Sequence, residues 1–122
     1  MTGGDDRRRP LSVVFYRAAS GREPVREWLR LLSRPDRQSV GRDIKTVQRD
    51  WPLGMPLVRK MEPGLWELRS HLNGRIGRVV FTVVEGSMVP LHGFIKKSEK
   101  TPGTELSTAR RRLAELRRGR SA

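Results

Sequence analysis

The sequence predicts an α+β fold in which a small antiparallel sheet packs against helices, with the elements in the order β-α-α-β-β-β-α. Apolar residues recur at helical spacing in three separate segments, whereas β-branched or alternating apolar runs occupy four others. The last three of these runs follow one another closely and are separated by turn residues, which favours neighbouring strands joined as hairpins.

The first half of the chain predicts one strand and two helices. Residues 11–16 are β-branched and aromatic, and residues 20–22 interrupt this run. Pro24 suits the first turn of a helix, whose apolar stripe consists of Val25, Trp28, Leu29 and Leu32. Ser33 is the predicted cap of a second helix, with a stripe formed by Val40, Ile44, Val47 and Trp51.

The second half predicts a loop, three strands and a last helix. Residues 52–64 are rich in Pro and Gly and indicate the loop. The strands are expected at residues 64–70, 75–85 and 88–96, with a hairpin turn at residues 85–87 and with Pro90 as a sign of an edge strand or a bulge. Thr101 and Pro102 then begin a helix with the stripe Leu106, Ala109, Leu113 and Leu116.

A chain of 122 residues is long enough for one domain, which we expect at residues 11–118, between disordered ends at residues 1–10 and 119–122. Without Cys it has no disulfide scaffold, no thiol nucleophile and no Cys-ligated metal, and we expect neither a metal nor a cofactor. It has no apolar run of about 18 residues, and no apolar stretch follows the N-terminal arginines. We therefore expect a cytoplasmic protein that does not bind membranes.

The charge predicts a nucleic-acid partner. Lys and Arg number 26 against 13 Asp and Glu, which gives a net charge of +13. Residues 61–95 hold three Arg and three Glu, whereas residues 96–122 hold nine basic and three acidic residues. The arginines of the predicted sheet therefore stand out in neutral surroundings, and the excess charge lies where the last strand meets the last helix.

Side chains alternate along strands, and this places the polar residues. If Trp66, Leu68, Val79, Phe81 and Val83 pack on the helices, Arg69 and Arg78 share the open face of the sheet. In the third strand, one face carries the apolar residues Val89, Leu91 and Ile95 and is expected to pack in the core. His92 and Lys96 would then lie on the opposite face, beside the two arginines. A bulge at Pro90 or Gly93 would reverse half of that strand.

More ordinary roles remain open for several of these residues. Arg69 can pair with Glu67 or Glu85 as part of the sheet surface. His92 can be a hydrogen-bonded structural residue, and Phe94 is expected in the core. His71, beside a predicted turn at residues 72–74, is expected in solvent.

Three motifs carry a family resemblance: GLWELR at residues 64–69, RVVF at 78–81 and LHGFIKKSEKTP at 91–102. With them the chain resembles the phage-derived, HigB-like branch of the RelE/ParE toxin superfamily. The resemblance implies a small antiparallel sheet flanked by helices and the toxin of a type II toxin-antitoxin system. HigB- and RelE-like members cut messenger RNA in the ribosomal A site, and a helix-turn-helix antitoxin inhibits them. The implied partners are therefore such an antitoxin and messenger RNA on the ribosome.

The resemblance also implies site residues. The arginines of the first two motifs correspond to Arg69 and Arg78, and the basic residues of the third to Lys96, Lys97 and Lys100. Some relatives place a Tyr or His near the chain end, but here the only Tyr is Tyr16 and none of either follows Lys100. The residues expected to bind RNA are Lys96, Lys97, Lys100, Arg110, Arg117 and Arg118.

Metal-free RNA cleavage uses the ribose 2′-hydroxyl as nucleophile and needs a base, a stabiliser of phosphorane charge and an acid. Arg69 and Arg78 suit the charge stabilisation. The base is expected among Lys96, Lys97 and Lys100, because neighbouring positive charge lowers the pKa of a lysine, or it is His92. Two alternatives remain: a ParE-like inhibitor of DNA gyrase, and a non-catalytic basic protein that binds nucleic acid.

Overall fold

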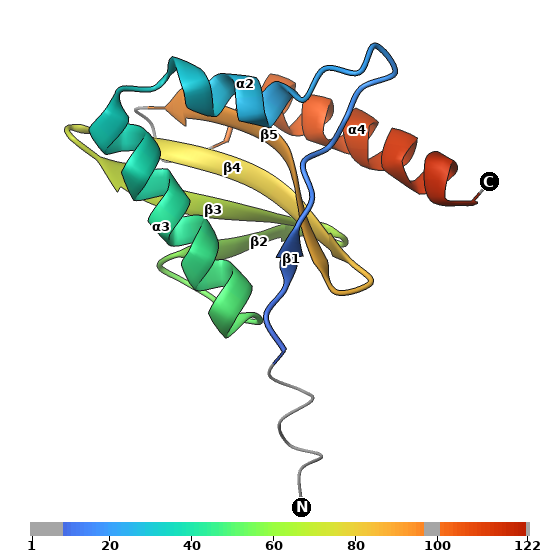
Figure 1. Ribbon diagram of the computed structural model, residues 1–122, viewed down its shortest axis with the longest axis horizontal. Coiled ribbons are helices and arrows are strands. Elements are labelled where there is room, and N and C mark those ends of the chain that lie inside the picture. Colours follow the sequence, from blue (N-terminus) through green and yellow to red (C-terminus); the bar gives the residue numbers. More distant parts are fainter. Residues whose placement is uncertain (1–8, 97–100, 122) are drawn as a thin grey trace, which may run out of the picture.

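The computed structural model describes residues 9–96 and 101–121. These residues form three helices and five strands, which confirms the α+β fold (Figure 1). The helices are α2 (Pro24–Leu31), α3 (Arg34–Asp50) and α4 (Gly103–Ser121). The strands are β1 (Ser12–Val13), β2 (Val58–Glu62), β3 (Leu65–Leu72), β4 (Arg75–Val84) and β5 (Ser87–Lys96).

The sheet has the strand order β1-β5-β4-β3-β2 and differs from the prediction at both edges. β1 pairs with β5 in parallel, so the sheet is mixed and not wholly antiparallel. β2 lies within the segment predicted as a loop, which was wrong for residues 58–62. Only Val58 of this strand is fully buried, so its sequence lacks the apolar alternation that marks a strand.

The helices cover the two faces of the sheet. On one face, α2 and α3 pack on a core that includes Leu68, Val79 and Phe81, as the strand parity predicted. On the other face, α4 buries Ala109 and Leu113 against the second core, which includes Leu65, Val80, Val89 and Leu91. The face that was expected to be open is therefore partly covered, and this decides what the site residues can reach. Among the described residues, no helix is long and apolar enough to cross a membrane.

A bulge at Leu91 divides β5. Phe81 pairs with Pro90, whereas the preceding Val80 pairs with His92, so Leu91 is the extra residue. Val89 and Leu91 consequently pack beneath α4 and not beneath α2 and α3. The reversal that a bulge was expected to cause does occur, and it leaves His92 and Lys96 on the α4 face.

Local signals explain how the elements begin and end. The Ser33 side chain caps α3 by accepting a hydrogen bond from the backbone of Asp36 at 3.3 Å. Glu85 and Gly86 both adopt positive φ, as a tight two-residue hairpin requires.

α4 continues to Ser121, beyond the domain end predicted at Arg118. Most of the tail expected at residues 1–10 lies outside the described residues.

Candidate active site

Three rows of cross-strand neighbours form the α4 face at one end of the sheet. The pairing registers of β3, β4 and β5 define each row, because directly opposed residues point to the same side. We call these nine residues the row patch: Glu67, Val80 and His92; Arg69, Arg78 and Phe94; His71, Ile76 and Lys96. Four residues that sequence analysis proposed for the site, Arg69, Arg78, His92 and Lys96, lie within it.

The prediction that Arg78 is exposed was wrong. Its side chain is fully buried and forms an ion pair with the equally buried Glu67, with 3.3 Å between Nη1 and Oε1. Thr101, just before α4, donates a hydrogen bond to Glu67 and lies 3.4 Å from Nη1 of Arg78. The sequence could not indicate this burial, because it depends on where α4 crosses the sheet.

Arg69 is the arginine of the row patch that solvent reaches. It is half-buried, and it lines a depression at the edge of β3, beyond the end of β2, together with His71 and residues of α3. Its Nε atom is buried, and no hydrogen-bond partner for it lies among the described residues. The pairing of Arg69 with Glu67, which the sequence left open, does not form because Glu67 pairs with Arg78, so the charge of Arg69 remains available to a ligand.

His92 is held between two side chains of α4. Its Nε2 atom lies 2.5 Å from Glu105 Oε1, and Nη1 of Arg112 lies 3.3 Å from its Nδ1 atom. Since a guanidinium can only donate, Nδ1 accepts, and the ring proton of a neutral His92 is on Nε2, where it donates to Glu105. The ring also stacks on Phe94, at 5.5 Å between centroids. These contacts correspond to the structural role that sequence analysis left open.

Lys96 and His71 flank Ile76 in the third row. Both line a shallow depression of about 390 Å³ at the turn between β3 and β4, together with Arg75. His71 is exposed, as expected, while Lys96 is half-buried. The predicted site residues Lys97 and Lys100 lie outside the described residues.

The basic residues of α4 differ in their surroundings. Arg110 is engaged by Glu62 of β2, at 2.7 Å between Nη2 and Oε1, and this carboxylate is held charged because the hydrogen bond and the charge of Arg110 lower its pKa. Arg117 and Arg118 are exposed. Arg112 is half-buried, and burial lowers the pKa of its guanidinium.

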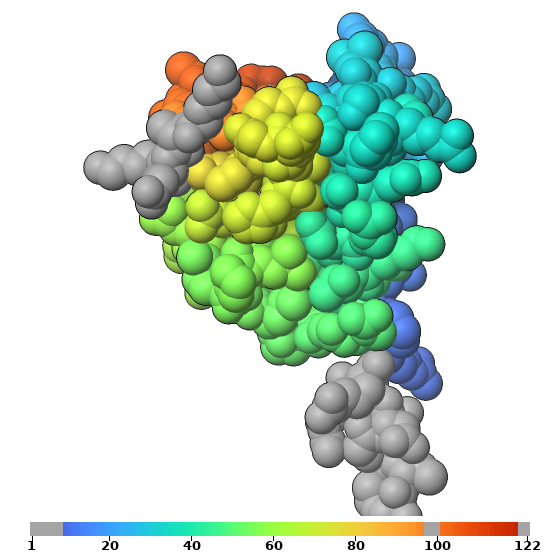
Figure 2. Space-filling model, turned by 90° about the vertical axis from the view of Figure 1, so that its left-hand side faces the viewer, coloured from blue at the N-terminus to red at the C-terminus, as the bar shows by residue number. Residues whose placement is uncertain are grey.

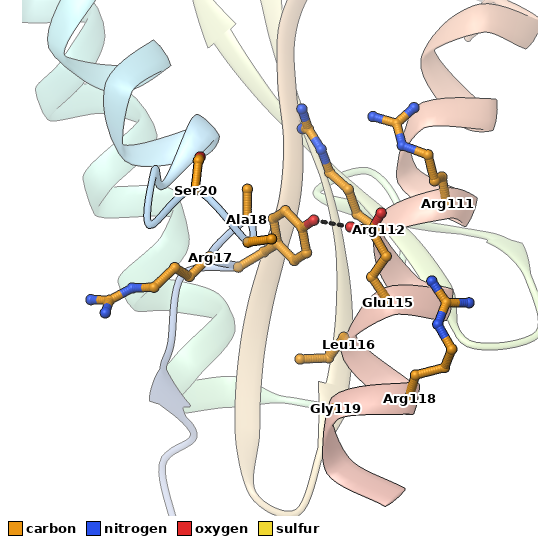
Figure 3. A pocket seen from close by; sticks show the side chains of 11 residues that line it. Arg17, Ala18, Ser20, Arg111, Arg112, Glu115, Leu116, Arg118 and Gly119 are labelled. Carbon is orange, nitrogen blue, oxygen red and sulfur yellow. Dashed lines mark hydrogen bonds between the residues drawn. The ribbon is translucent and has the colours of Figure 1, made fainter. Parts of the chain in front are cut away.

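A third hollow, which the sequence did not indicate, lies between residues 16–20 and α4 (Figure 3). It encloses about 770 Å³, and arginines from both segments surround it: Arg17, Arg111, Arg112 and Arg118. Inside it the Tyr16 hydroxyl donates a hydrogen bond to Glu115. Burial and the contact with Glu115 raise the pKa of Tyr16, so the phenol stays protonated above its usual range.

No group of three or more potential metal-ligating residues gathers within residues 9–96 and 101–121. The ionisable groups of the row patch are the guanidinium, ammonium, imidazole and carboxylate groups of its side chains.

A family of known proteins matches most of the chain. The family described as "Phage derived protein Gp49-like (DUF891)" matches residues 27–114, from within α2 to within α4, and so spans the whole row patch. No curated protein matches the chain.

Proposed function

The chain belongs to the Gp49-like family, a RelE/HigB-like toxin family, and we propose that it is a ribosome-dependent endoribonuclease that cuts messenger RNA. Membership of a toxin family implies an antitoxin partner. We further propose that this antitoxin is a helix-turn-helix protein, as the resemblance to HigB-like toxins implies, and that the toxin acts in the cytoplasm.

The observation that supports cleavage best is the surroundings of Arg69. Its half-buried guanidinium lies one row from Lys96 and has no carboxylate partner among the described residues, so it can receive a phosphate without first losing such a partner. Glu67 does not compete for it, because Arg78 occupies Glu67. The row patch thus presents positive charge on a strand segment whose net charge is zero.

In the proposed reaction the ribose 2′-hydroxyl attacks the neighbouring phosphate, and the products carry a cyclic phosphate and a free 5′-hydroxyl. Arg69 stabilises the charge that develops on the non-bridging oxygens. Arg78 does not touch RNA in this arrangement. It is a positioning residue, which holds Glu67 and Thr101 in place beneath the start of α4.

The ribosome contributes by orienting the RNA, which lowers the demand on the toxin's own acid–base groups. We propose that Arg110, Arg117 and Arg118 on α4 contact RNA phosphates, together with Lys96, Lys97 and Lys100. Arg110 has to leave Glu62 to do so.

Expression of the chain in growing cells, with readouts for translation, transcript integrity and DNA integrity, tests the proposal. We expect growth arrest with cut transcripts and intact DNA. Arg69→Ala should restore growth, because removal of a transition-state donor lowers rates by about 10²–10³. The matched control Arg34→Ala removes the same charge from the exposed start of α3, on the other side of the sheet, and should remain toxic.

Other outcomes identify the alternatives. Gyrase-dependent DNA breaks with intact transcripts would indicate a ParE-like activity. Normal growth with soluble protein and intact transcripts would contradict a toxin of either kind and favour a non-catalytic binding protein.

A further inference from the structure

We propose that His71 is the general base of the cleavage reaction and Lys96 its general acid. This inference rests on the proposed function, and it gives a catalytic role to a histidine that neither the sequence motifs nor the family resemblance single out.

The strand pairing places His71 and Lys96 on opposite sides of Ile76. His71 pairs with Ile76, and Ile76 pairs with Lys96, so the three residues point to the α4 face in one row. Neighbouring strands lie about 4.8 Å apart, which separates the backbones of residues 71 and 96 by about 10 Å. A phosphate above Ile76 would therefore have an imidazole on one side and an ammonium on the other.

Arg69 completes this arrangement. It precedes His71 by two residues on the same strand, which corresponds to about 7 Å along the same face. His71 also lines both depressions at this end of the sheet, one shared with Arg69 and the other shared with Lys96. Among the described residues, His71 alone borders both of these hollows.

His71 is available for proton transfer, whereas His92 is not. His71 is exposed, and no hydrogen bond or ion pair of its ring occurs among the described residues. His92 has both ring nitrogens engaged, by Glu105 and by Arg112. Figure 2 looks onto this end of the molecule, where the yellow hairpin of β3 and β4 lies at the surface between the start of α4 and the α2–α3 layer.

The proposed step balances as follows. The His71 imidazole takes the proton of the 2′-hydroxyl, and the 2′-oxygen forms a bond to phosphorus. The bond from phosphorus to the 5′-oxygen breaks, and that oxygen takes a proton from the Lys96 ammonium. The products are a 2′,3′-cyclic phosphate and a 5′-hydroxyl. His71 then releases its proton to water, and Lys96 regains one from water.

The placement of the two groups matches the geometry of the reaction. The attacking and leaving oxygens lie on opposite sides of phosphorus in an in-line displacement, so a base and an acid on opposite sides of the phosphate can each reach one of them. An imidazole is suited to the base because its unperturbed pKa lies near neutrality.

The experiment measures the single-turnover rate at which the toxin cuts a reporter messenger RNA on stalled ribosomes. The rate is followed over about two pH units on either side of 6.5, the ordinary pKa of imidazole. We expect the wild-type rate to rise with pH through one ionisation. His71→Ala should lower the plateau by about 10²–10⁴ and abolish this rise. Added imidazole should restore part of the missing rate.

Two variants serve as controls. His71→Gln fills the same surface position, so it should lower the plateau and abolish the pH-dependent rise without rescue by imidazole, and both variants should keep the wild-type melting temperature because the side chain is exposed. His92→Gln should keep the pH-dependent rise. An unchanged rate and pH profile in His71→Ala, or a defect that imidazole does not restore while the pH rise persists, would overturn the inference and leave the proposed function standing. A wild-type chain that cuts no RNA on ribosomes would overturn both.

Discussion

At the scale of single residues, the buried pair of Arg78 and Glu67 is the most consequential feature of the site. Strand alternation correctly predicted that Arg78 shares a face with Arg69, because the period of two is a local property of the backbone. It could not predict that Thr101 and α4 would cover Arg78, because that contact joins residues 23 positions apart. The contacts of His92 with Glu105 and Arg112 were missed for the same reason.

Removal of Arg78 should therefore destabilise the protein. We expect Arg78→Ala to lower the free energy of unfolding by about 3–5 kcal/mol, because it leaves the Glu67 carboxylate buried without its ion-pair partner. Denaturant unfolding of the purified variant measures this. The double variant Glu67→Leu/Arg78→Met, which removes both charges, should recover much of the stability. Equal stability of Arg78→Ala and the wild type would contradict the buried pair.

At the scale of elements, the helical stripes, the Ser33 cap and the hairpin turns could all be predicted, because each depends on residues within a few positions of one another. β2 could not be predicted. It is an edge strand with exposed Arg59 and Lys60, and it pairs with β3 through its backbone, which leaves little trace in the side chains. The parallel pairing of β1 with β5 is likewise a long-range contact.

The packing of α2 on β5 depends on a glycine. The Trp28 ring lies directly over Gly93, and a β-carbon at Gly93 would overlap it. We expect Gly93→Ala to lower the free energy of unfolding by about 1–3 kcal/mol through overpacking. The matched control is Gly41→Ala on α3, where an added β-carbon meets nothing within 4 Å. This variant should raise the free energy of unfolding by about 0.5–1 kcal/mol. Thermal unfolding gives the melting temperature of each variant relative to the wild type. If both melting temperatures changed in the same direction, this packing would be contradicted.

Tyr16 joins the N-terminal segment to α4 and makes this contact sensitive to alkaline pH. Burial and Glu115 raise the pKa of the folded-state phenol above its ordinary value of about 10. The stabilisation is therefore fully present below that value and disappears as pH rises through the folded-state pKa. We expect the free energy of unfolding to fall more steeply above about pH 10 in the wild type than in Tyr16→Phe. Parallel pH curves for the two proteins would contradict this role.

At the scale of the whole molecule, charge is distributed unevenly around the sheet. The net charge of +13 is concentrated away from β3 and β4, and α4 carries exposed Arg117 and Arg118. Composition and sequence alone predicted this excess of charge, because it requires no knowledge of the fold. The proposed function assigns a separate role to each region: we propose that α4 attracts RNA over long range and that the row patch acts on the bound phosphate.

Neutralising Arg117 and Arg118 together should weaken association with ribosomes and leave the cleavage step nearly unchanged. The salt dependence of binding should become shallower by about one unit of slope for each phosphate that the variant no longer neutralises. Binding to ribosomes at several salt concentrations, with single-turnover cleavage measured at saturation, separates these effects. A salt slope equal to that of the wild type would contradict a role for α4 in attracting RNA.

The chemistry of the cut ends tests the central claim most directly. Messenger RNA recovered from translating ribosomes treated with the toxin should end in a 2′,3′-cyclic phosphate on one fragment and a 5′-hydroxyl on the other. Arg34→Ala should give the same ends in the same amount, and Arg69→Ala should give almost none. Fragments with a 3′-hydroxyl and a 5′-phosphate, or equal cleavage by Arg69→Ala, would contradict the assignment of this sheet face as a nuclease site.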